Sequence, residues 1–549
     1  MEGVTVSLFL LLAVVVSRWL ARALPWAVPL PLVQIVLGAA IATVADAGVT
    51  LDPDIFFLLF LPPLLFLDGW RIPKEGLFRD KEIILELAVG LVFFTVVGAG
   101  FLIHWMIPAM PLAVAFALAA IVSPTDPIAV AAISSRTPIP KRLMHILEGE
   151  SLLNDASGLV CMRFAVAAAV TGVFSPVAAF GTFLWLAFGG IAIGVGVTWG
   201  ITRAKDFIAR RLGEDTGSQI LISVLIPFAA YLLAEHLHCS GILAAVAGGI
   251  TMSYVELSGR AQATTRVRRN GVWDTIQFAV NGIVFVILGE QLPDLIEGAA
   301  RVVQEAGHRE PLWLIVYVIA INAALAALRF AWVWISLKLT LFRRTRHADA
   351  GAQRPGWRLI AATSLAGVRG AITLAGVLTL PLFLADGTPF PARDLAIFLA
   401  AGVILVSMLV ATLSLPVLLR GLQLPPEPSH EEEEDRARIA AAGAAMTAIE
   451  RLQHELGEGR ADADLYADAT ARLMAAYRAR IDGHSRTGEE AARRRESERI
   501  DRELSLAGLR AEREELYRLV RSRQLSEEVV RKLVREVDLI EARLTASEH

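Results

Sequence analysis

The feature that most constrains this chain is a series of long apolar runs. About 20 consecutive apolar residues are needed to cross the hydrocarbon core of a bilayer as an α-helix. Thirteen runs approach or exceed that length, at residues 4–22, 28–45, 54–69, 84–106, 111–133, 147–171, 177–201, 218–236, 240–257, 273–293, 312–337, 357–384 and 394–421. Because lipid offers no hydrogen bonds to the backbone, runs of this length must be helical. The sequence therefore predicts an all-α, polytopic membrane protein with about thirteen transmembrane helices.

The charges between these runs predict the orientation. If the N-terminus lies outside, the loops on the inner side hold nearly all the Lys and Arg residues of the membrane part. The outer loops then hold only Arg301, Arg309 and Arg393. Cytoplasmic loops are enriched in Lys and Arg, so we expect the N-terminus outside and the C-terminus in the cytoplasm. The membrane expected is the plasma membrane, here a bacterial inner membrane. The first run has no basic region before it and no cleavage site, which indicates a retained helix.

The last 126 residues differ from the rest in composition. The whole chain is 55% hydrophobic and 19% charged, below the ~25% charged residues of soluble domains, and nearly half of its charged residues follow Pro425. We therefore predict a transmembrane domain at 1–423 and a charged, helical cytoplasmic tail at 424–549. Apolar residues in the tail, such as Leu504 and Leu509, indicate amphipathic helices that pack on each other or on a second copy. A ligand-sensing tail is the alternative, but no nucleotide or metal motif supports it.

Two polar clusters interrupt the apolar runs, and the first is Ser123-Pro124-Thr125-Asp126-Pro127 in the fifth run. Each proline lacks an amide donor, so two of them predict an unwound stretch with free carbonyls. Such backbone is tolerated in a membrane only inside protein or beside a watery cavity. With the oxygens of Thr125 and Asp126, this stretch is suited to a hard monovalent cation. A proline kink capped by Thr125 is the alternative, but it leaves Asp126 unexplained.

The second cluster is Glu150-Ser151-Leu152-Leu153-Asn154-Asp155, in the sixth run. On a helix, Ser151 and Asp155 share one face, and Glu150 and Asn154 share the adjacent face. We expect Asp155 to carry the ion, because a carboxylate in a partly dry cavity holds either a proton or a cation, in competition. That competition couples a cation flux to an opposite proton flux. For Glu150 we prefer an ion pair between helices to cation ligation.

Two arginines within the apolar runs offer that ion pair. Arg329 and Arg369 stay protonated, so each requires a partner or a cavity. One of them is expected to pair with Glu150, and the sequence leaves open which. The glycines in Gly367-Val368-Arg369-Gly370-Ala371 indicate a second interrupted helix.

The positions of the two interruptions suggest an internal symmetry. They fall in the fifth and twelfth spans, which run in opposite directions. This predicts inverted repeats of spans 1–6 and 8–13, linked by span 7, as in secondary transporters. Two further charged residues also lie in or near the apolar runs. We expect Asp68 near the cytoplasmic mouth of span three, and Arg163 as an additional pairing group.

Five motifs, taken together and in this order, resemble one family. They are Phe60-Leu61-Pro62-Pro63-Leu64-Leu65-Phe66, Pro124-Thr125-Asp126-Pro127, Glu150–Asp155, Phe285–Gly289 and Gly367–Ala371. The chain resembles the NhaP-type sodium/proton antiporters and the related sodium–hydrogen exchangers, most closely the bacterial form with a long tail. The resemblance covers about residues 5–421. It implies an NhaA-like fold, with a dimerisation half and a six-helix core of spans 4–6 and 11–13 that moves like an elevator.

The resemblance also implies roles for individual residues. Asp155 would bind Na⁺ or a proton, and the Na⁺ site would be completed by Asp126, Thr125 and Ser151. Glu150 would support this site. The remaining supporting residues would be Asn154, Arg369 and Arg329. An asparagine before Asp155 is similar to the electroneutral branch, which exchanges one cation for one proton.

These observations favour a secondary active transporter that exchanges Na⁺, or alternatively Li⁺ or K⁺, for H⁺. We expect a homodimer in lipid, no cofactor besides the transported Na⁺ and H⁺, and no nucleic-acid partner. The alternatives are a monovalent cation channel and a K⁺-preferring cation/proton antiporter. An enzyme is not expected, because the chain has no His-Glu-x-x-His motif. A primary pump is disfavoured because the chain has no phosphate-binding Gly-x-x-x-x-Gly-Lys-Ser/Thr motif.

Overall fold

The structure is a computed structural model, and it divides into two compact units, Met1–Gln423 and Leu424–His549. It describes residues 2–24, 28–44, 53–72, 74, 79–126, 130, 141–171, 176–257, 262–305, 312–345, 357–384, 387–420, 430–457, 463–484, 489–522 and 524–545. Pro127 and the expected break at residues 424–428 lie outside these ranges. The two units are described separately below.

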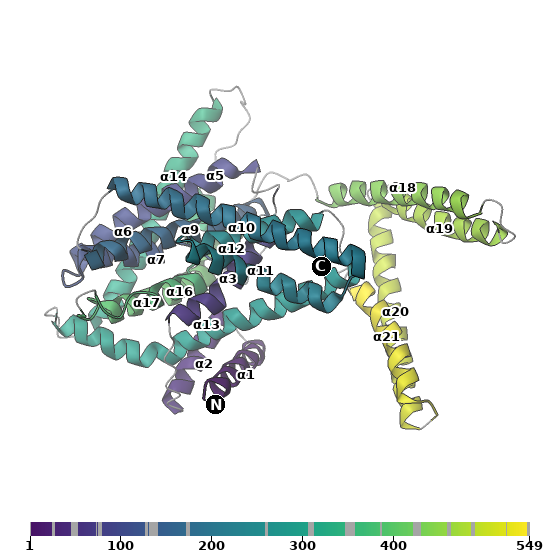
Figure 1. The fold of residues 1–549 in the computed structure, drawn as a ribbon, viewed down its shortest axis with the longest axis horizontal. Coiled ribbons are helices and arrows are strands. Elements are labelled where there is room, and N and C mark those ends of the chain that lie inside the picture. Colours follow the sequence, from purple (N-terminus) through teal and green to yellow (C-terminus); the bar gives the residue numbers. More distant parts are fainter. Residues whose placement is uncertain are drawn as a thin grey trace. The chain divides into compact units, whose positions relative to one another are not determined.

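The described part of the first unit is almost entirely helical (Figure 1). Its helices are α1 (Glu2–Ala23), α2 (Leu30–Val44), α3 (Pro53–Arg71), α5 (Lys81–Leu85), the π-helix η1 (Glu86–Leu91), α6 (Val92–Met106), α7 (Leu112–Val122), α9 (Lys141–Thr171), α10 (Pro176–Leu212), α11 (Thr216–His236), α12 (Gly241–Leu257), α13 (Ala263–Glu305), α14 (Leu312–Thr345), α15 (Trp357–Leu365), α16 (Ala371–Leu378) and α17 (Arg393–Leu419).

Each of the thirteen apolar runs falls on one of these helices or on a broken series of them. Within the described residues, eight helices are long and apolar enough to cross a membrane by length and composition. Three more, α2, α7 and α12, are apolar but shorter. The remaining runs fall on α3 and on the broken pair α15 and α16, so the number of crossings stays a prediction. The boundary between the eighth and ninth runs lies between His236 and Gly241.

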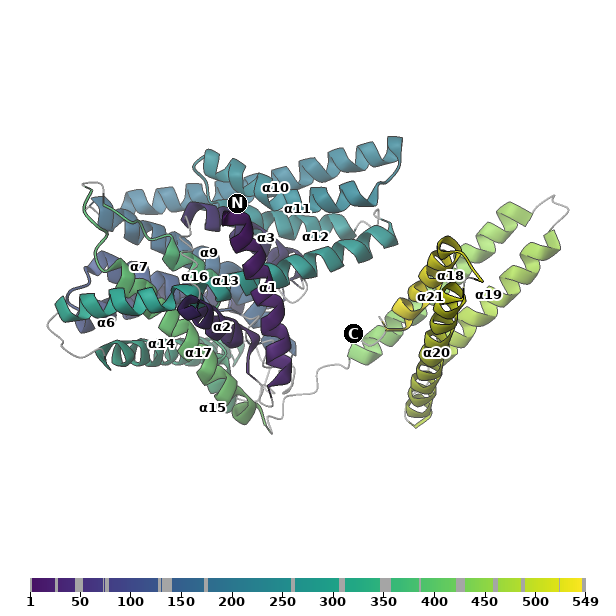
Figure 2. The same ribbon diagram turned by 90° about the horizontal axis from the view of Figure 1, so that it is seen from below.

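The packing sorts these helices into two groups. The first, called the scaffold group here, comprises α1, α2, α3, α10, α11, α12 and α13; α2 packs on α13, α3 packs on α12, and α10, α11 and α12 lie side by side (Figure 2). The second, called the core group, comprises α5, η1, α6, α7, α9, α14, α15, α16 and α17. The groups meet mainly where α13 packs against α16 and α17.

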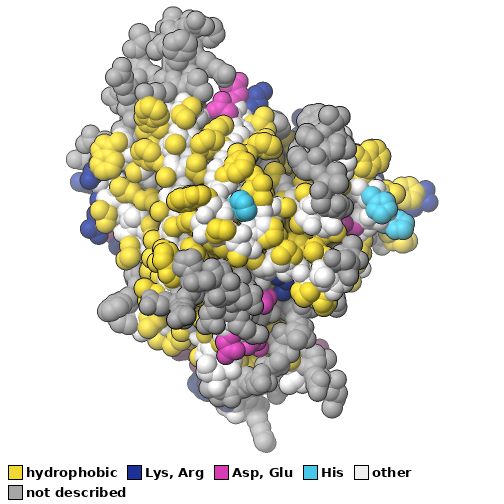
Figure 3. Space-filling model, turned by 90° about the vertical axis from the view of Figure 1, so that its left-hand side faces the viewer, with side chains coloured by type: hydrophobic (Ala, Val, Ile, Leu, Met, Phe, Trp, Pro, Cys, Tyr) yellow, Lys and Arg dark blue, Asp and Glu magenta, His cyan; other side chains and the backbone are white. Residues whose placement is uncertain are grey.

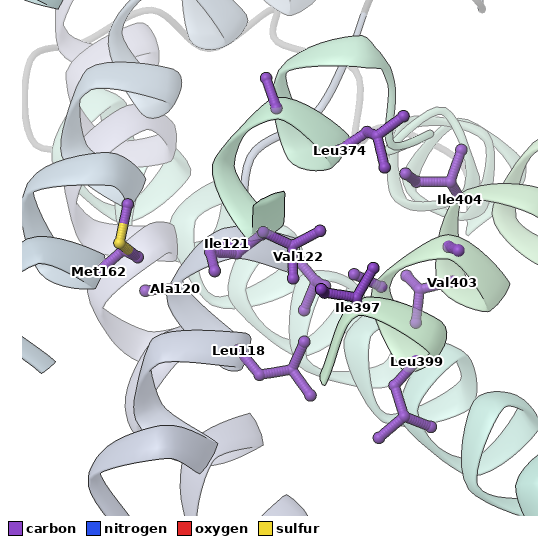
Figure 4. Close-up of a cluster of buried hydrophobic side chains, with 14 of the residues drawn as sticks. Leu118, Ala120, Ile121, Val122, Met162, Leu374, Ile397, Leu399, Val403 and Ile404 are labelled. Carbon is purple, nitrogen blue, oxygen red and sulfur yellow. The ribbon is translucent and has the colours of Figure 1, made fainter. Parts of the chain in front are cut away.

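The core group is held together by small and branched apolar side chains. Figure 4 shows Leu118, Ile121 and Val122 of α7 facing Leu374 of α16 and Ile397 of α17. All five are almost completely buried. Close packing of this kind fixes the ends of the two short helices α7 and α16, and the polar residues follow or precede those ends.

The outer surface of the first unit suits lipid. Large apolar side chains are exposed along α10, among them Trp185, Phe188, Ile191, Val195 and Trp199. Figure 3 shows one face of the molecule on which hydrophobic side chains predominate over charged ones. An exposed apolar surface on this scale would aggregate in water, and together with the eight long apolar helices it establishes a multi-pass membrane protein.

The second unit consists of two helical hairpins in its described part (Figure 1). Helices α18 (His430–Gly457) and α19 (Ala463–His484) pack on each other, and so do α20 (Glu489–Arg521) and α21 (Glu527–Thr545). Leu509 of α20 is buried with Val534 and Val537 of α21, whereas Leu504 is 67% exposed. Amphipathic helices were expected here, although Leu504 does not belong to their buried face.

Candidate functional site

The site forms where two interrupted helices cross. Helix α7 ends at Val122 and the chain is not helical at Ser123–Asp126; likewise α15 ends at Leu365 and α16 begins only at Ala371. The two irregular segments bind each other, because the amide of Asp126 donates to the carbonyl of Val368 at 2.7 Å. Prolines at one segment and glycines at the other prevent regular helix there.

Arg369 stabilises this crossing. Its Nε donates to the carbonyl of Val122 at 2.9 Å, and its Nη1 donates to the carbonyl of Gly367. Val122 is the last residue of α7, so the guanidinium lies at the negative end of that helix. The backbone amide of Arg369 also donates to Oγ of Ser407 on α17, at 3.2 Å. Arg369 thus supplies donors that the unwound backbone lacks.

A small cavity lies beside the crossing. Its volume of about 20 Å³ is enough for one water or one unhydrated monovalent cation. The core group contributes most of its walls, and α3 and α13 of the scaffold group close it. Its oxygen-bearing residues are Asp68, Thr125, Asp126, Ser151, Asp155, Asn281 and Thr373.

Ser151 and Asp155 face this cavity from consecutive turns of α9. Both are buried, with 7% and 3% of their surface exposed. Within the described residues, neither side chain has a hydrogen-bond partner in the protein, which leaves their oxygens available to a ligand. Three carboxylates, those of Asp68, Asp126 and Asp155, line one small space, so protons or a cation must offset their mutual repulsion.

Glu150 and Asn154 lie on the adjacent face of α9 and take part in a buried network instead. Glu150 pairs with Arg329 of α14 through two hydrogen bonds, of which Nη2 to Oε2 is 2.7 Å. Nε of Arg329 donates to the carbonyl of Thr363 at 3.1 Å. The structure thus selects Arg329 over Arg369 as the partner of Glu150.

The same network fixes Thr125. Its hydroxyl donates to Oε1 of Glu150 at 3.4 Å and accepts from Nδ2 of Asn154 at 3.0 Å. The sequence suggested the hydroxyl of Thr125 as an ion ligand, but that hydroxyl is engaged here. The backbone carbonyl of Thr125 belongs to the unwound segment. Oδ1 of Asn154 is buried without a partner among the described residues.

Three lining residues were not assigned to the ion site from the sequence. Asp68 was expected at the mouth but lines the cavity itself, and Asn281 and Thr373 were not singled out. Asn281 lies on α13, about one turn before the Phe285–Gly289 motif. An isolated polar residue inside an apolar run is the signal that marks Asn281 and Thr373, but only the packing of α13 and α16 reveals where they point.

Comparison with known proteins assigns the chain to a family. Residues 8–421 match the family model described as sodium/hydrogen exchanger, transmembrane. The chain belongs to the sodium/hydrogen exchanger family. A protein of Escherichia coli K12 that carries the name uncharacterized Na(+)/H(+) exchanger YjcE is 42% identical over 550 residues, covering 99% of each chain.

Other relatives of this exchanger carry more specific names. The sodium, potassium, lithium and rubidium/H(+) antiporter of Bacillus subtilis 168 is 45% identical over 423 residues, which are 76% of this chain and 62% of that protein. Among solved structures, the sodium proton antiporter MjNhaP1 of Methanocaldococcus jannaschii aligns with a TM-score of 0.60 and 18% identity, over 77% of this chain and 99% of that one. The fold is therefore that of an NhaP-type antiporter.

Proposed function

We propose that this exchanger moves one monovalent cation against one proton through the cavity at Asp155. The observation that carries the proposal is the buried carboxylate of Asp155, which has no hydrogen-bond partner among the described residues. It faces a cavity large enough for one ion, which Asp68 and Asp126 also line. A cation bound there would be held by Asp155, Asp126, Ser151 and the carbonyl of Thr125. Asp68 and Asn281 would contribute from the scaffold group.

Competition at Asp155 would supply the coupling. When the cation leaves, the repulsion among the three carboxylates favours protonation, and deprotonation prepares the site for the next cation. Each transport cycle then moves one positive charge inward and one outward, which makes the exchange electroneutral. Glu150 binds neither the cation nor the transported proton in this scheme, because Arg329 holds it in a bidentate pair. Beyond the two transported ions the mechanism uses no cofactor, and it makes no covalent bond, so the protein acts as a transporter rather than an enzyme.

Na⁺ is the proposed main substrate. A broader range that includes K⁺ and Li⁺ is the second candidate, and it is favoured by the name of the Bacillus subtilis relative. Oxygen ligands from backbone and side chains bind all three ions, and site size decides among them. We further propose the plasma membrane as location, the N-terminus outside, a homodimer, and a role in pH homeostasis and salt tolerance. The loop charges support the orientation.

Everted membrane vesicles test the proposed exchange. After respiration acidifies the interior, addition of Na⁺ outside should release protons, and a pH-sensitive dye should report the dissipation of the gradient. The rate should not change when the membrane potential is clamped to zero. A channel would instead give a potential-driven leak without proton movement. Repeating the assay with K⁺ and Li⁺ distinguishes exchange of mainly Na⁺ from exchange of the broader set of cations.

A further inference from the structure

Helix α9 carries a charge that the proposed site does not use. Arg163 is the charged residue in the apolar stretch from Ala156 to Val170. It lies eight residues beyond Asp155, which is about 12 Å along a helix. A charge within a membrane span requires a partner or a cavity, and it often marks a function.

The partner of Arg163 belongs to the other helix group. Nη2 of Arg163 lies 2.9 Å from Oε1 of Glu235, near the end of α11. The same carboxylate oxygen accepts from the amide of Gly241, at 3.2 Å. The turn that joins α11 to α12 holds Glu235 in place, with His238 in the left-handed region at φ 54° and the amide of Cys239 bonded to Ala234. The scaffold group therefore presents a fixed acceptor to the core group.

This ion pair and the cavity lie toward opposite ends of the helices. The cavity residue Asp68 is three positions before the end of α3, and Arg71 at that end bonds Asp274 at 2.5 Å and Gln277 at 2.9 Å. Arg71 and Asp274 are 41% and 64% exposed, so the cavity lies about one turn inside an exposed surface. Arg163 and Glu235 instead lie toward the ends of α9 and α11, away from the start of α9.

We propose that the pair of Arg163 and Glu235 is a latch that keeps the site closed on the side where α9 and α11 end. The inference rests on the proposed exchange by alternating access. For the site to open to that side, the core group must move against the scaffold group and the pair must break. In the proposed orientation this is the extracellular side.

The two ion pairs of α9 differ in exposure. This difference fits one pair that breaks in each cycle and one that stays intact. The side chains of Arg163 and Glu235 are 37% and 33% exposed, so packed protein does not enclose this pair and it can separate as the two groups move. Glu150 and Arg329 are almost fully buried within one group, and their pair stays intact as that group moves.

Thiol labelling from each side of the membrane tests the latch. The background carries Cys161→Ser and Cys239→Ala, and Ser151→Cys reports access to the cavity. In right-side-out and everted vesicles, a membrane-impermeant maleimide should label the probe mainly from the side where α9 begins. Glu235→Gln or Arg163→Gln should raise labelling from the opposite side several-fold. The charge exchange Arg163→Glu with Glu235→Arg should return the ratio to its original value.

Arg393→Gln is the matched control. Arg393 donates to the carbonyls of Leu378 and Leu380, so its bonds stay within the core group, and its removal should leave the labelling ratio unchanged. An unchanged ratio after Glu235→Gln, or a charge exchange that fails to restore it, would overturn the latch. Labelling does not require transport, so loss of the proposed exchange function would leave this result intact.

A reversible cross-link gives a second measurement that does not depend on removing the charges. Arg163→Cys and Glu235→Cys, in the cysteine-free background, can be joined by a short bis-methanethiosulfonate reagent. We expect linkage to stop exchange and a reductant to restore it. A linked protein that exchanges at the unlinked rate would show that the two groups need not separate here.

Discussion

At the scale of single residues, the site depends on an ion pair that is buried without being part of the cavity. Glu150 and Arg329 are 1% and 2% exposed. Two charges so placed gain little net stability over apolar residues, but removing one leaves the other unpaired in a dry interior. Their bidentate geometry also orients Thr125, and through it the unwound segment that lines the cavity.

Glu150→Gln should therefore destabilise the protein by about 3–5 kcal/mol, because the guanidinium of Arg329 loses its counter-charge. The thermal unfolding midpoint in detergent measures this. Combining Glu150→Gln with Arg329→Met should recover much of the loss, since no unpaired charge remains. Equal destabilisation by the single and the double variant would contradict a role as a charge pair.

Gly370 lies against Asp126 more tightly than any side chain would permit. A Cβ built on Gly370 would overlap the carboxylate of Asp126. Gly370→Ala should displace that carboxylate and lower the rate of exchange at least tenfold. The control is Gly196→Ala on α10, where nothing lies within 4 Å of the added carbon. It should leave exchange unchanged and add ~0.5–1 kcal/mol of stability. A normal exchange rate for Gly370→Ala would contradict a role for the Asp126 carboxylate in the site.

Residue-level prediction succeeded where the spacing along one helix decides the outcome. The four-residue separation of Ser151 and Asp155 was enough to place both on one face of α9. It could not identify the partner of Glu150, because Arg329 lies 179 residues away and Arg369 was an equal candidate. Nor could it place Asp68 or Asn281, since their positions depend on how α3 and α13 pack against the core group.

At the scale of elements, two helix pairs pack in the same way, through glycines that contact the backbone of the neighbouring helix. A Cβ on Gly38 of α2 would overlap a carbonyl of α13, and one on Gly289 would overlap the carbonyl of Ile35. Gly249 of α12 and Gly69 of α3 approach each other's helix in the same way. A two-fold exchange of spans 1–6 with spans 8–13 would convert one pair into the other. This correspondence supports the predicted inverted repeats.

A helix cap outside the membrane allows a prediction of pH dependence. Asp215 precedes α11, and hydrogen bonds from the hydroxyl and the amide of Ser218 lower its pKa from the ordinary value. A lowered carboxylate pKa adds stability that is present above the ordinary pKa and is lost as the pH falls through the folded-state value. The stability advantage of wild type over Asp215→Asn, measured by thermal unfolding, should therefore shrink from pH 6 to pH 3. An advantage independent of pH would contradict this account.

The elements themselves were largely predictable because lipid imposes helices. The apolar runs fixed where helices lie, and the paired prolines and glycines marked both interruptions. Apolar composition alone could not divide these helices into a core and a scaffold group, because apolar faces toward lipid and toward protein look alike. The division came from the family resemblance, whose core of spans 4–6 and 11–13 corresponds to the core group. It also gave no sign of the π-helix Glu86–Leu91, which has an ordinary apolar sequence.

At the scale of the whole molecule, the loop charges predict that both the tail and the loop before α9 lie in the cytoplasm. A reporter enzyme that folds only in the cytoplasm should be active when fused after His549. The same reporter should be inactive when it is inserted between α9 and α10, at residues 172–175. The reverse pattern would invert the orientation, and it would place the proposed latch on the cytoplasmic side.

The central claim is that Asp155 itself carries the cation and the proton. The most direct test compares wild type with Asp155→Asn in vesicles from a host without antiporters of its own, with expression matched. An asparagine keeps the shape but can neither ionise nor release a proton. We predict that Na⁺ releases no protons from vesicles with Asp155→Asn, and that the variant fails to support growth in salt. Cation-driven proton release that persists in Asp155→Asn would contradict the account.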